Sequence, residues 1–158
     1  MDITTVADDL IVAHRPGAGG EVIRLTGLQP ETLYHVDNNE VMTLARPPGE
    51  LLCRLGTVND LHLGEMECGK IDDDPRGPIQ RVEPGEPPHP LTMNRAAVEE
   101  MGDAKLDAVI VKGDLSCDGA DDEFATFEAC YRSAFGDRLH VTRGNHDAYH
   151  GQQAYTGD

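Results

Sequence analysis

Three short apolar runs in this chain are each followed directly by a small polar motif. The runs cover residues 51–58, 108–111 and 139–141, and their Leu, Ile and Val content is typical of parallel strands that are buried on both faces. Residues 91–102 and 121–135 carry helical patterns between them. The order strand, helix, strand, helix, strand predicts an α/β fold with a parallel sheet and right-handed crossovers.

The polar motifs are Asp60-Leu61-His62, Gly113-Asp114 and Gly144-Asn145-His146-Asp147. In an open α/β sheet the carboxyl ends of the strands form the ligand crevice, so we expect these side chains to converge there. Their carboxylate, imidazole and amide groups are the ligands that hard and borderline divalent cations take. Two cations about 3.5–4 Å apart would hold the attacking and leaving oxygens of an in-line displacement at phosphorus. His146 is then free for proton transfer to the leaving group.

Taken together and in this order, the three motifs resemble those of the calcineurin-like metallophosphoesterases over residues 51–150. The resemblance implies the parallel βαβαβ half of a four-layer α/β sandwich and hydrolysis of phosphate mono- or diesters. It implies two divalent or trivalent ions of manganese, iron or zinc. It also implies that Asp60 and His62 bind the first ion, and that Asp114 bridges both. Asn145 would bind the second ion, and His146 would be the catalytic acid.

The chain departs from the family pattern in two places. Family members often carry an Asp that orients the catalytic His, but Cys117 occupies that position here. A buried thiol is a poor partner for an imidazolium, so either Asp118 reaches in or the support is missing. The family also supplies later histidines, including a Gly-His-x-His motif, whereas this chain stops at Asp158. We therefore expect a fragment that lacks the C-terminal half of its domain, binds manganese or zinc weakly and is nearly inactive alone.

The first part of the chain, residues 1–48, is predicted to form a small antiparallel β unit, with one turn at residues 16–20. Residues 25–34 resemble the stretch before the sixth strand of fibronectin type III domains, in which a tyrosine can form a corner. The metallophosphoesterase part is predicted to cover residues 49–158. Within it, residues 64–90 are dense in Gly, Pro and acidic residues and are predicted to be a long loop, either solvated or facing the substrate.

Composition narrows the class of partner. A net charge of −16 disfavours a nucleic-acid-binding face, because neutralising phosphates requires Lys and Arg. The four cysteines form no CxxC pair, so we expect free buried thiols. No segment resembles a signal peptide or a membrane span, which favours a soluble cytoplasmic protein without membrane contact.

Two other classes of function remain open. One is a non-catalytic binding module that retains a vestigial half-site, and the other is a structural metal protein. Metal-dependent release of phosphate from an ester would distinguish an enzyme from both.

Overall fold

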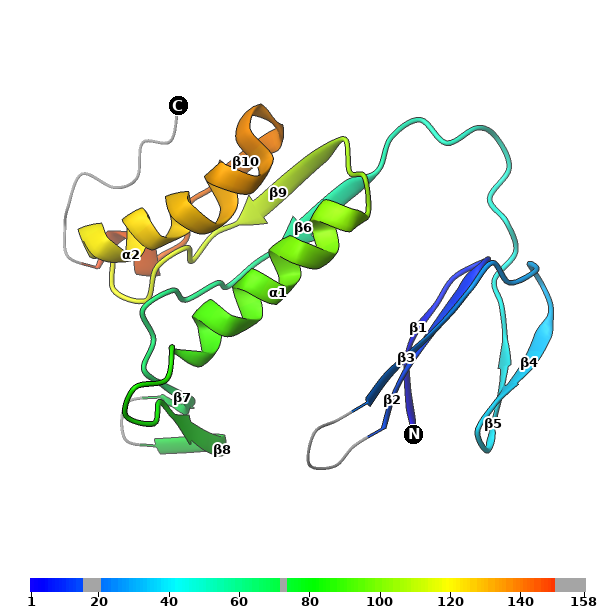
Figure 1. The fold of residues 1–158 in the computed structure, drawn as a ribbon, viewed down its shortest axis with the longest axis horizontal. Helices are drawn as coiled ribbons and strands as arrows, with labels where there is room; N and C mark the ends of the chain where they lie inside the picture. Colours follow the sequence, from blue (N-terminus) through cyan, green and yellow to red (C-terminus); the bar gives the residue numbers. More distant parts are fainter. Residues whose placement is uncertain (16–20, 72–73, 150–158) are drawn as a thin grey trace. The chain divides into compact units, whose positions relative to one another are not determined.

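The computed structural model describes residues 1–15, 21–71 and 74–149 of the chain. The chain divides into two compact units, Met1–Glu50 and Leu51–Asp158, which are drawn in Figure 1 and are described separately here. The predicted turn at residues 16–20 and residues 72–73 of the predicted loop lie outside the described residues.

The strands of the N-terminal unit pair antiparallel, which confirms the prediction of a small antiparallel β unit at the start of the chain. Its three-stranded sheet has the order β1-β2-β3 and contains β1 (Asp2–Val6), β2 (Leu10–Arg15) and β3 (Glu21–Thr26). A separate hairpin pairs β4 (Leu33–Val36) with β5 (Asn39–Met42). The buried residues of its hydrophobic cluster are Ile11, Ala13, Val36 and Val41.

Tyr34 makes the contact that defines a tyrosine corner. Its hydroxyl accepts a hydrogen bond of 2.8 Å from the backbone N–H of Gln29, a few residues upstream. The buried Thr43 hydroxyl donates to the Gln29 carbonyl at 2.6 Å and accepts from the Thr32 N–H at 3.0 Å. These bonds fix the turn that leads into β4.

The C-terminal unit contains the predicted parallel sheet, in the order β10-β9-β6. Its strands are β6 (Leu55–Val58), β9 (Ala108–Lys112) and β10 (Leu139–Thr142). The first strand is shorter than predicted, since residues 51–54 precede it and are exposed. The order of strands and helices along the chain confirms the predicted α/β class.

Two helical segments connect the strands. Helix α1 (His89–Asp103) lies between β6 and β9, as predicted. The second segment begins with α2 (Asp121–Phe127), continues through the π-helical turn η1 (Glu128–Arg132) and ends with α3 (Ser133–Phe135). The 3-10 turns η2 (Gly136–Arg138) and η3 (His146–Ala148) precede and follow β10. After β6 and after β9, a helical segment carries the chain back, so that the next strand starts at the same end of the sheet (Figure 1). All three strands therefore run in the same direction.

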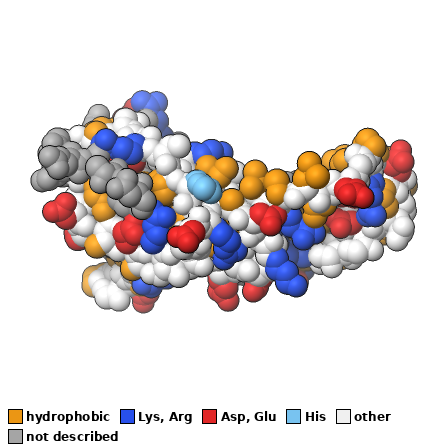
Figure 2. Space-filling view, turned by 90° about the horizontal axis from the view of Figure 1, so that it is seen from above, with side chains coloured by type: hydrophobic (Ala, Val, Ile, Leu, Met, Phe, Trp, Pro, Cys, Tyr) orange, Lys and Arg blue, Asp and Glu red, His pale blue; other side chains and the backbone are white. Residues whose placement is uncertain are grey.

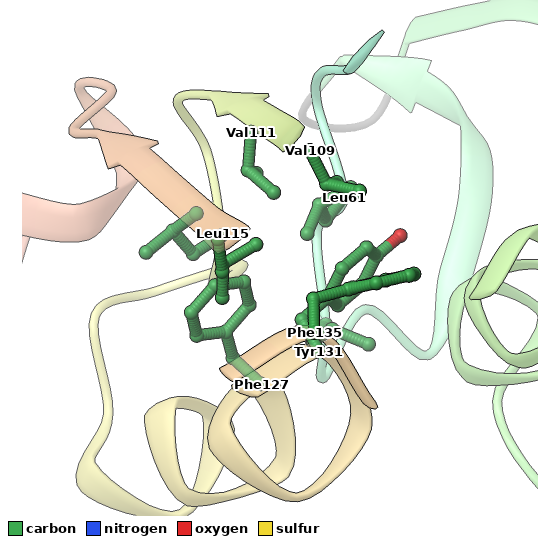
Figure 3. Packing of buried hydrophobic residues seen from close by; sticks show 9 residues of the cluster. Leu61, Val109, Val111, Leu115, Phe127, Tyr131 and Phe135 are labelled. Carbon is green, nitrogen blue, oxygen red and sulfur yellow. The ribbon is translucent and has the colours of Figure 1, made fainter. Parts of the chain in front are cut away.

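The core of this unit lies between the sheet and the second helical segment. Val109 and Val111 of β9 face three aromatic side chains spaced four residues apart (Figure 3). Those aromatic residues are Phe127, Tyr131 and Phe135. The Tyr131 hydroxyl donates to Asn94 Oδ1 on α1 at 2.5 Å. Burial of such side chains stabilises a fold by about 1.5–3 kcal/mol each.

The core also includes the apolar residues of two polar motifs. Leu61 stands between Asp60 and His62 in sequence, and it is buried, as is Leu115, which follows Asp114. Asn94 Nδ2 donates to the Leu61 carbonyl at 3.1 Å. The backbone of both motifs is therefore anchored in the core, which limits where their polar side chains can point.

The prediction of one long loop over residues 64–90 is wrong. Strand β7 (Glu67–Ile71) pairs antiparallel with β8 (Asp74–Arg81), with an irregularity between Cys68 and Lys70. Glu67 forms ion pairs with Lys70 at 2.7 Å and with Arg81 at 2.5 Å. The Gly and Pro content of this segment favoured a loop over strands. A two-stranded hairpin tolerates Pro because each strand has one edge that pairs with no other strand.

The surface of the protein is mixed in charge (Figure 2), and its cysteines form no disulfide among the described residues. On the face shown in Figure 2, acidic and basic side chains are interspersed. All four cysteines are free, as predicted, but the prediction that they are buried is wrong: Cys53 is exposed, and Cys68, Cys117 and Cys130 are partly buried. In the part of the chain that the structure describes, no helix has the length and apolar character needed to cross a membrane.

Candidate metal centre

The loops after β6 and β9 run side by side beyond the ends of their strands. The His62 N–H donates to the Asp114 carbonyl at 3.0 Å, and the Leu63 N–H donates to the Leu115 carbonyl at 3.2 Å. The Cys117 N–H then donates back to the Leu63 carbonyl at 2.9 Å. These bonds continue the parallel pairing for several residues and hold His62 next to Asp114.

Two glycines allow the loops after β9 and β10 to approach closely. The Gly113 N–H donates to the Thr142 carbonyl at 3.1 Å, and a Cβ on Gly113 would lie 3.0 Å from the Gly144 Cα. A Cβ on Gly144 would overlap the Asp114 carboxylate. That carboxylate accepts the backbone N–H of His146 at 3.1 Å. The glycines of the second and third motifs are therefore required by packing.

Three of the predicted site residues form one group of donor atoms. His62, Asp114 and His146 each offer an atom within 4.8 Å of the others, and all three are partly buried. His62 Nε2 lies 3.8 Å from Asp114 Oδ2, and the His62 and His146 ring centroids are 4.4 Å apart. Ligands bound to one ion at about 2.0–2.2 Å lie about 3–4 Å apart, so the first pair has a suitable spacing. Imidazole with carboxylate fits zinc, iron or manganese.

The other two predicted ligands lie in the first and third motifs, and the side chain of each has a polar neighbour of its own. Asp60 is exposed, and its carboxylate accepts a hydrogen bond from the Asn59 side chain. Asn145 is also exposed, and its Nδ2 donates to the Tyr149 hydroxyl at 2.7 Å. The structure thus brings together His62, Asp114 and His146, and it engages Asp60 and Asn145 with neighbouring polar groups.

The backbone is strained at three of the predicted ligands. Asp60, His62 and Asp114 have φ values of +53°, +45° and +47°. They are half of the six non-glycine residues with positive φ in the described part of the chain. Left-handed conformations of such residues cost about 1 kcal/mol or more and cluster at functional sites. Their concentration in two adjacent motif loops indicates that these loops accept a less stable backbone conformation, which sets the direction of the three side chains.

The imidazole of His146 is held by a backbone carbonyl. Its Nδ1 lies 2.6 Å from the Cys117 carbonyl oxygen, and a carbonyl can only accept, so Nδ1 carries the proton. Nε2 is then the nitrogen available to a ligand or a substrate. The expectation that Asp118 supports this ring, or that support is missing, is therefore wrong. A backbone acceptor leaves no trace in residue type, which is why the sequence did not reveal it.

The Cys117 side chain has no comparable part in the site. Burial raises the pKa of its thiol to about 12, with smaller contributions from nearby carboxylates, Asp118 first. The thiol is therefore protonated near neutral pH and is a poor nucleophile.

Cys117, Asp118 and Glu123 form a second group of possible donors. However, Glu123 Oε2 accepts the backbone N–H groups of Asp118 and Ala120 at 3.0 Å each. That carboxylate satisfies donors at the start of α2, so a structural role accounts for its position.

Asp147 ties the third motif to the loop after β9. Its buried carboxylate accepts three hydrogen bonds: from the Ser116 N–H at 3.0 Å, the Ser116 hydroxyl at 2.8 Å and the Gly144 N–H at 2.8 Å. The Ser116 hydroxyl also accepts the Gly119 N–H at 3.2 Å. Sequence reasoning quoted Asp147 in the motif but gave it no role, and the structure shows it as the link between two site loops.

Asp147→Asn is expected to lower the free energy of unfolding by about 2–4 kcal/mol. Hydrogen bonds to a charged group contribute about 1.5–3 kcal/mol each, and the NH₂ group of the asparagine would face a backbone N–H that the carboxylate oxygen accepts. Ser116→Ala removes only the hydroxyl bond and should cost less. Urea unfolding of the two variants and the parent chain measures both losses. An Asp147→Asn variant as stable as the parent chain would contradict the linking role.

Comparison with known protein families identifies a family for this chain. A family model for calcineurin-like phosphoesterases matches residues 53–158, more than half of the chain. The matched range contains all three polar motifs. None of the curated proteins matches the chain, and none of the solved structures does.

Proposed function

The chain belongs to the calcineurin-like phosphoesterase family, and on that premise we propose that it hydrolyses phosphate mono- or diesters at a dinuclear metal centre. The observation that carries the proposal is the donor group of His62, Asp114 and His146, which three separate loops supply at one edge of a parallel sheet. The catalytic part is residues 49–158, and residues 1–48 are a separate β unit. A net charge of −16 favours small esters over nucleic acids bound across a basic surface.

The ligands follow the order of the motifs. Asp60 and His62 would hold the first ion, Asp114 would bridge the two ions, and Asn145 would hold the second. Bound manganese, iron or zinc supplies Lewis acidity, which lowers the pKa of water and neutralises charge on the phosphate. This assignment gives the first ion three protein ligands and the second ion two. We expect low affinity from these donors alone.

His146 would act as the catalytic acid. With Nδ1–H donated to the Cys117 carbonyl, a proton on Nε2 can pass to the leaving-group oxygen. The ring centroid of His146 lies 4.4 Å from that of His62 and 4.4 Å from that of Tyr149. A fixed ring with one free nitrogen suits proton transfer to a positioned substrate, and it also suits a metal ligand. Substitution separates these two roles.

Release of p-nitrophenol from p-nitrophenyl phosphate and from its diester analogue tests the proposed function. Because we expect low metal affinity, we expect slow hydrolysis by the chain at high manganese or zinc concentration, loss of this activity with EDTA, and recovery when the metal is returned. Calorimetry run in parallel measures metal binding. Metal binding without release of p-nitrophenol from either ester, at any metal concentration, would instead favour the non-catalytic module or the structural metal protein.

A further inference from the structure

We infer that Tyr149 is a positioning residue that orients the side chains of Asn145 and His146 together. The inference deepens the proposed function and rests on it, since that proposal makes Asn145 a metal ligand and His146 the catalytic acid. No motif singles out Tyr149, and only its contacts in the folded chain reveal it.

A tight turn brings the Tyr149 side chain back over the third motif. The 3-10 turn η3 is closed by two backbone hydrogen bonds of 3.2 Å, from Ala148 to the Asn145 carbonyl and from Tyr149 to the His146 carbonyl. The Tyr149 hydroxyl accepts Asn145 Nδ2 at 2.7 Å. Its ring centroid lies 4.4 Å from that of His146, at an interplanar angle of 47°. One side chain thus contacts both residues.

The contact with Asn145 suits a metal ligand. A side-chain amide has a donor edge and an acceptor edge, and a cation binds only the acceptor edge. The Tyr149 hydroxyl takes the donor edge, which leaves Oδ1 for the ion. Outer hydrogen bonds of this kind fix ligand orientation and strengthen metal binding. Without the Tyr149 hydroxyl, the exposed Asn145 side chain would lose this restraint. It would then lose more conformational entropy when it binds the ion.

The contact with His146 adds a third neighbour to its imidazole. The Cys117 carbonyl holds Nδ1, the His62 ring stands edge-on at 68°, and the Tyr149 ring lies at 47° to the imidazole. These neighbours restrict ring rotation and leave Nε2 as the reactive nitrogen. Tyr149 itself is 55% exposed, so a change of its side chain alters these contacts without opening the core.

Three variants of the whole chain test the inference, with Mn²⁺ as the probe in calorimetry. Tyr149→Phe removes the hydroxyl and keeps the ring, and we expect it to weaken Mn²⁺ binding by about 10–100-fold, the usual effect of losing an outer hydrogen bond to a ligand. Tyr149→Leu should weaken Mn²⁺ binding equally and should also slow hydrolysis of alkyl phosphates further, because the ring is gone. Tyr34→Phe removes a hydroxyl from the N-terminal unit and should leave Mn²⁺ affinity unchanged.

Asn145→Ala separates failure of the inference from failure of its premise. If Asn145→Ala weakens Mn²⁺ binding and Tyr149→Phe does not, the positioning role is overturned while the proposed function stands. If neither variant changes the affinity, Asn145 is not a ligand, and Tyr149 has none to position. If the parent chain binds no Mn²⁺ at all, the proposed centre itself fails. Weakening by both variants, with Tyr34→Phe unaffected, supports the inference.

Discussion

Asp114→Asn is expected to remove metal binding and turnover together. The carboxylate would hold both ions, and its neutral replacement keeps the shape and an oxygen for the His146 N–H while losing the charge. Charge neutralisation by bound metal is worth several kcal/mol at the transition state, so turnover should fall by about 10³-fold or more. Metal content after dialysis and phosphate release measure the two losses.

Asp137→Asn is the matched control, since Asp137 is exposed and lies in η2, outside the motif loops. It makes the same chemical change and should leave both quantities as in the parent chain. An Asp114→Asn variant with full metal content would show that this carboxylate does not bridge the ions, and Asp60 would then have to carry the charge.

His146→Gln is expected to keep the metal and lose the proton donor. Turnover of alkyl esters should then fall by about 10²–10⁴-fold, the usual contribution of a general acid. Esters of p-nitrophenol should recover much of this loss, because their leaving group departs without protonation. Comparing the two ester classes at saturating metal, together with metal content, gives both parts of the result.

His140→Gln provides the control for this substitution, because His140 is exposed on β10. Loss of metal from His146→Gln would assign His146 as a ligand, in keeping with its place in the donor group. Equal losses for aryl and alkyl esters would likewise exclude the role of acid.

The parallel sheet could be predicted because it rests on a strong local signal. Short apolar runs such as residues 108–111 are typical of buried strands, and the polar residues that follow them are expected at the carboxyl ends of those strands. The alternation of apolar and polar residues within the motifs is a second local signal, because it predicts which side chains are buried. Leu61 and Leu115 enter the core, whereas Asp60 is exposed and His62 and Asp114 are partly buried.

The remaining features depend on contacts that the residue types do not reveal. The ion pair between Glu67 and Arg81 joins β7 to β8 across a stretch whose Gly and Pro content is typical of a loop. The support of His146 is a carbonyl, which every residue possesses. Tyr149 reaches Asn145 only because η3 turns the chain back. No residue pattern encodes these three contacts.

The left-handed backbone at Asp60, His62 and Asp114 has a consequence for engineering this protein. Glycine adopts that conformation freely, so a library selected only for resistance to heat should accumulate glycine at these positions, at a gain of up to about 1 kcal/mol each. Domains are stable by about 5–15 kcal/mol, so such gains are large enough to be enriched. Every one of them would delete a proposed metal ligand. Selection for stability would therefore need a second screen for metal binding, because the most heat-resistant variants would be those that have lost the proposed metal ligands.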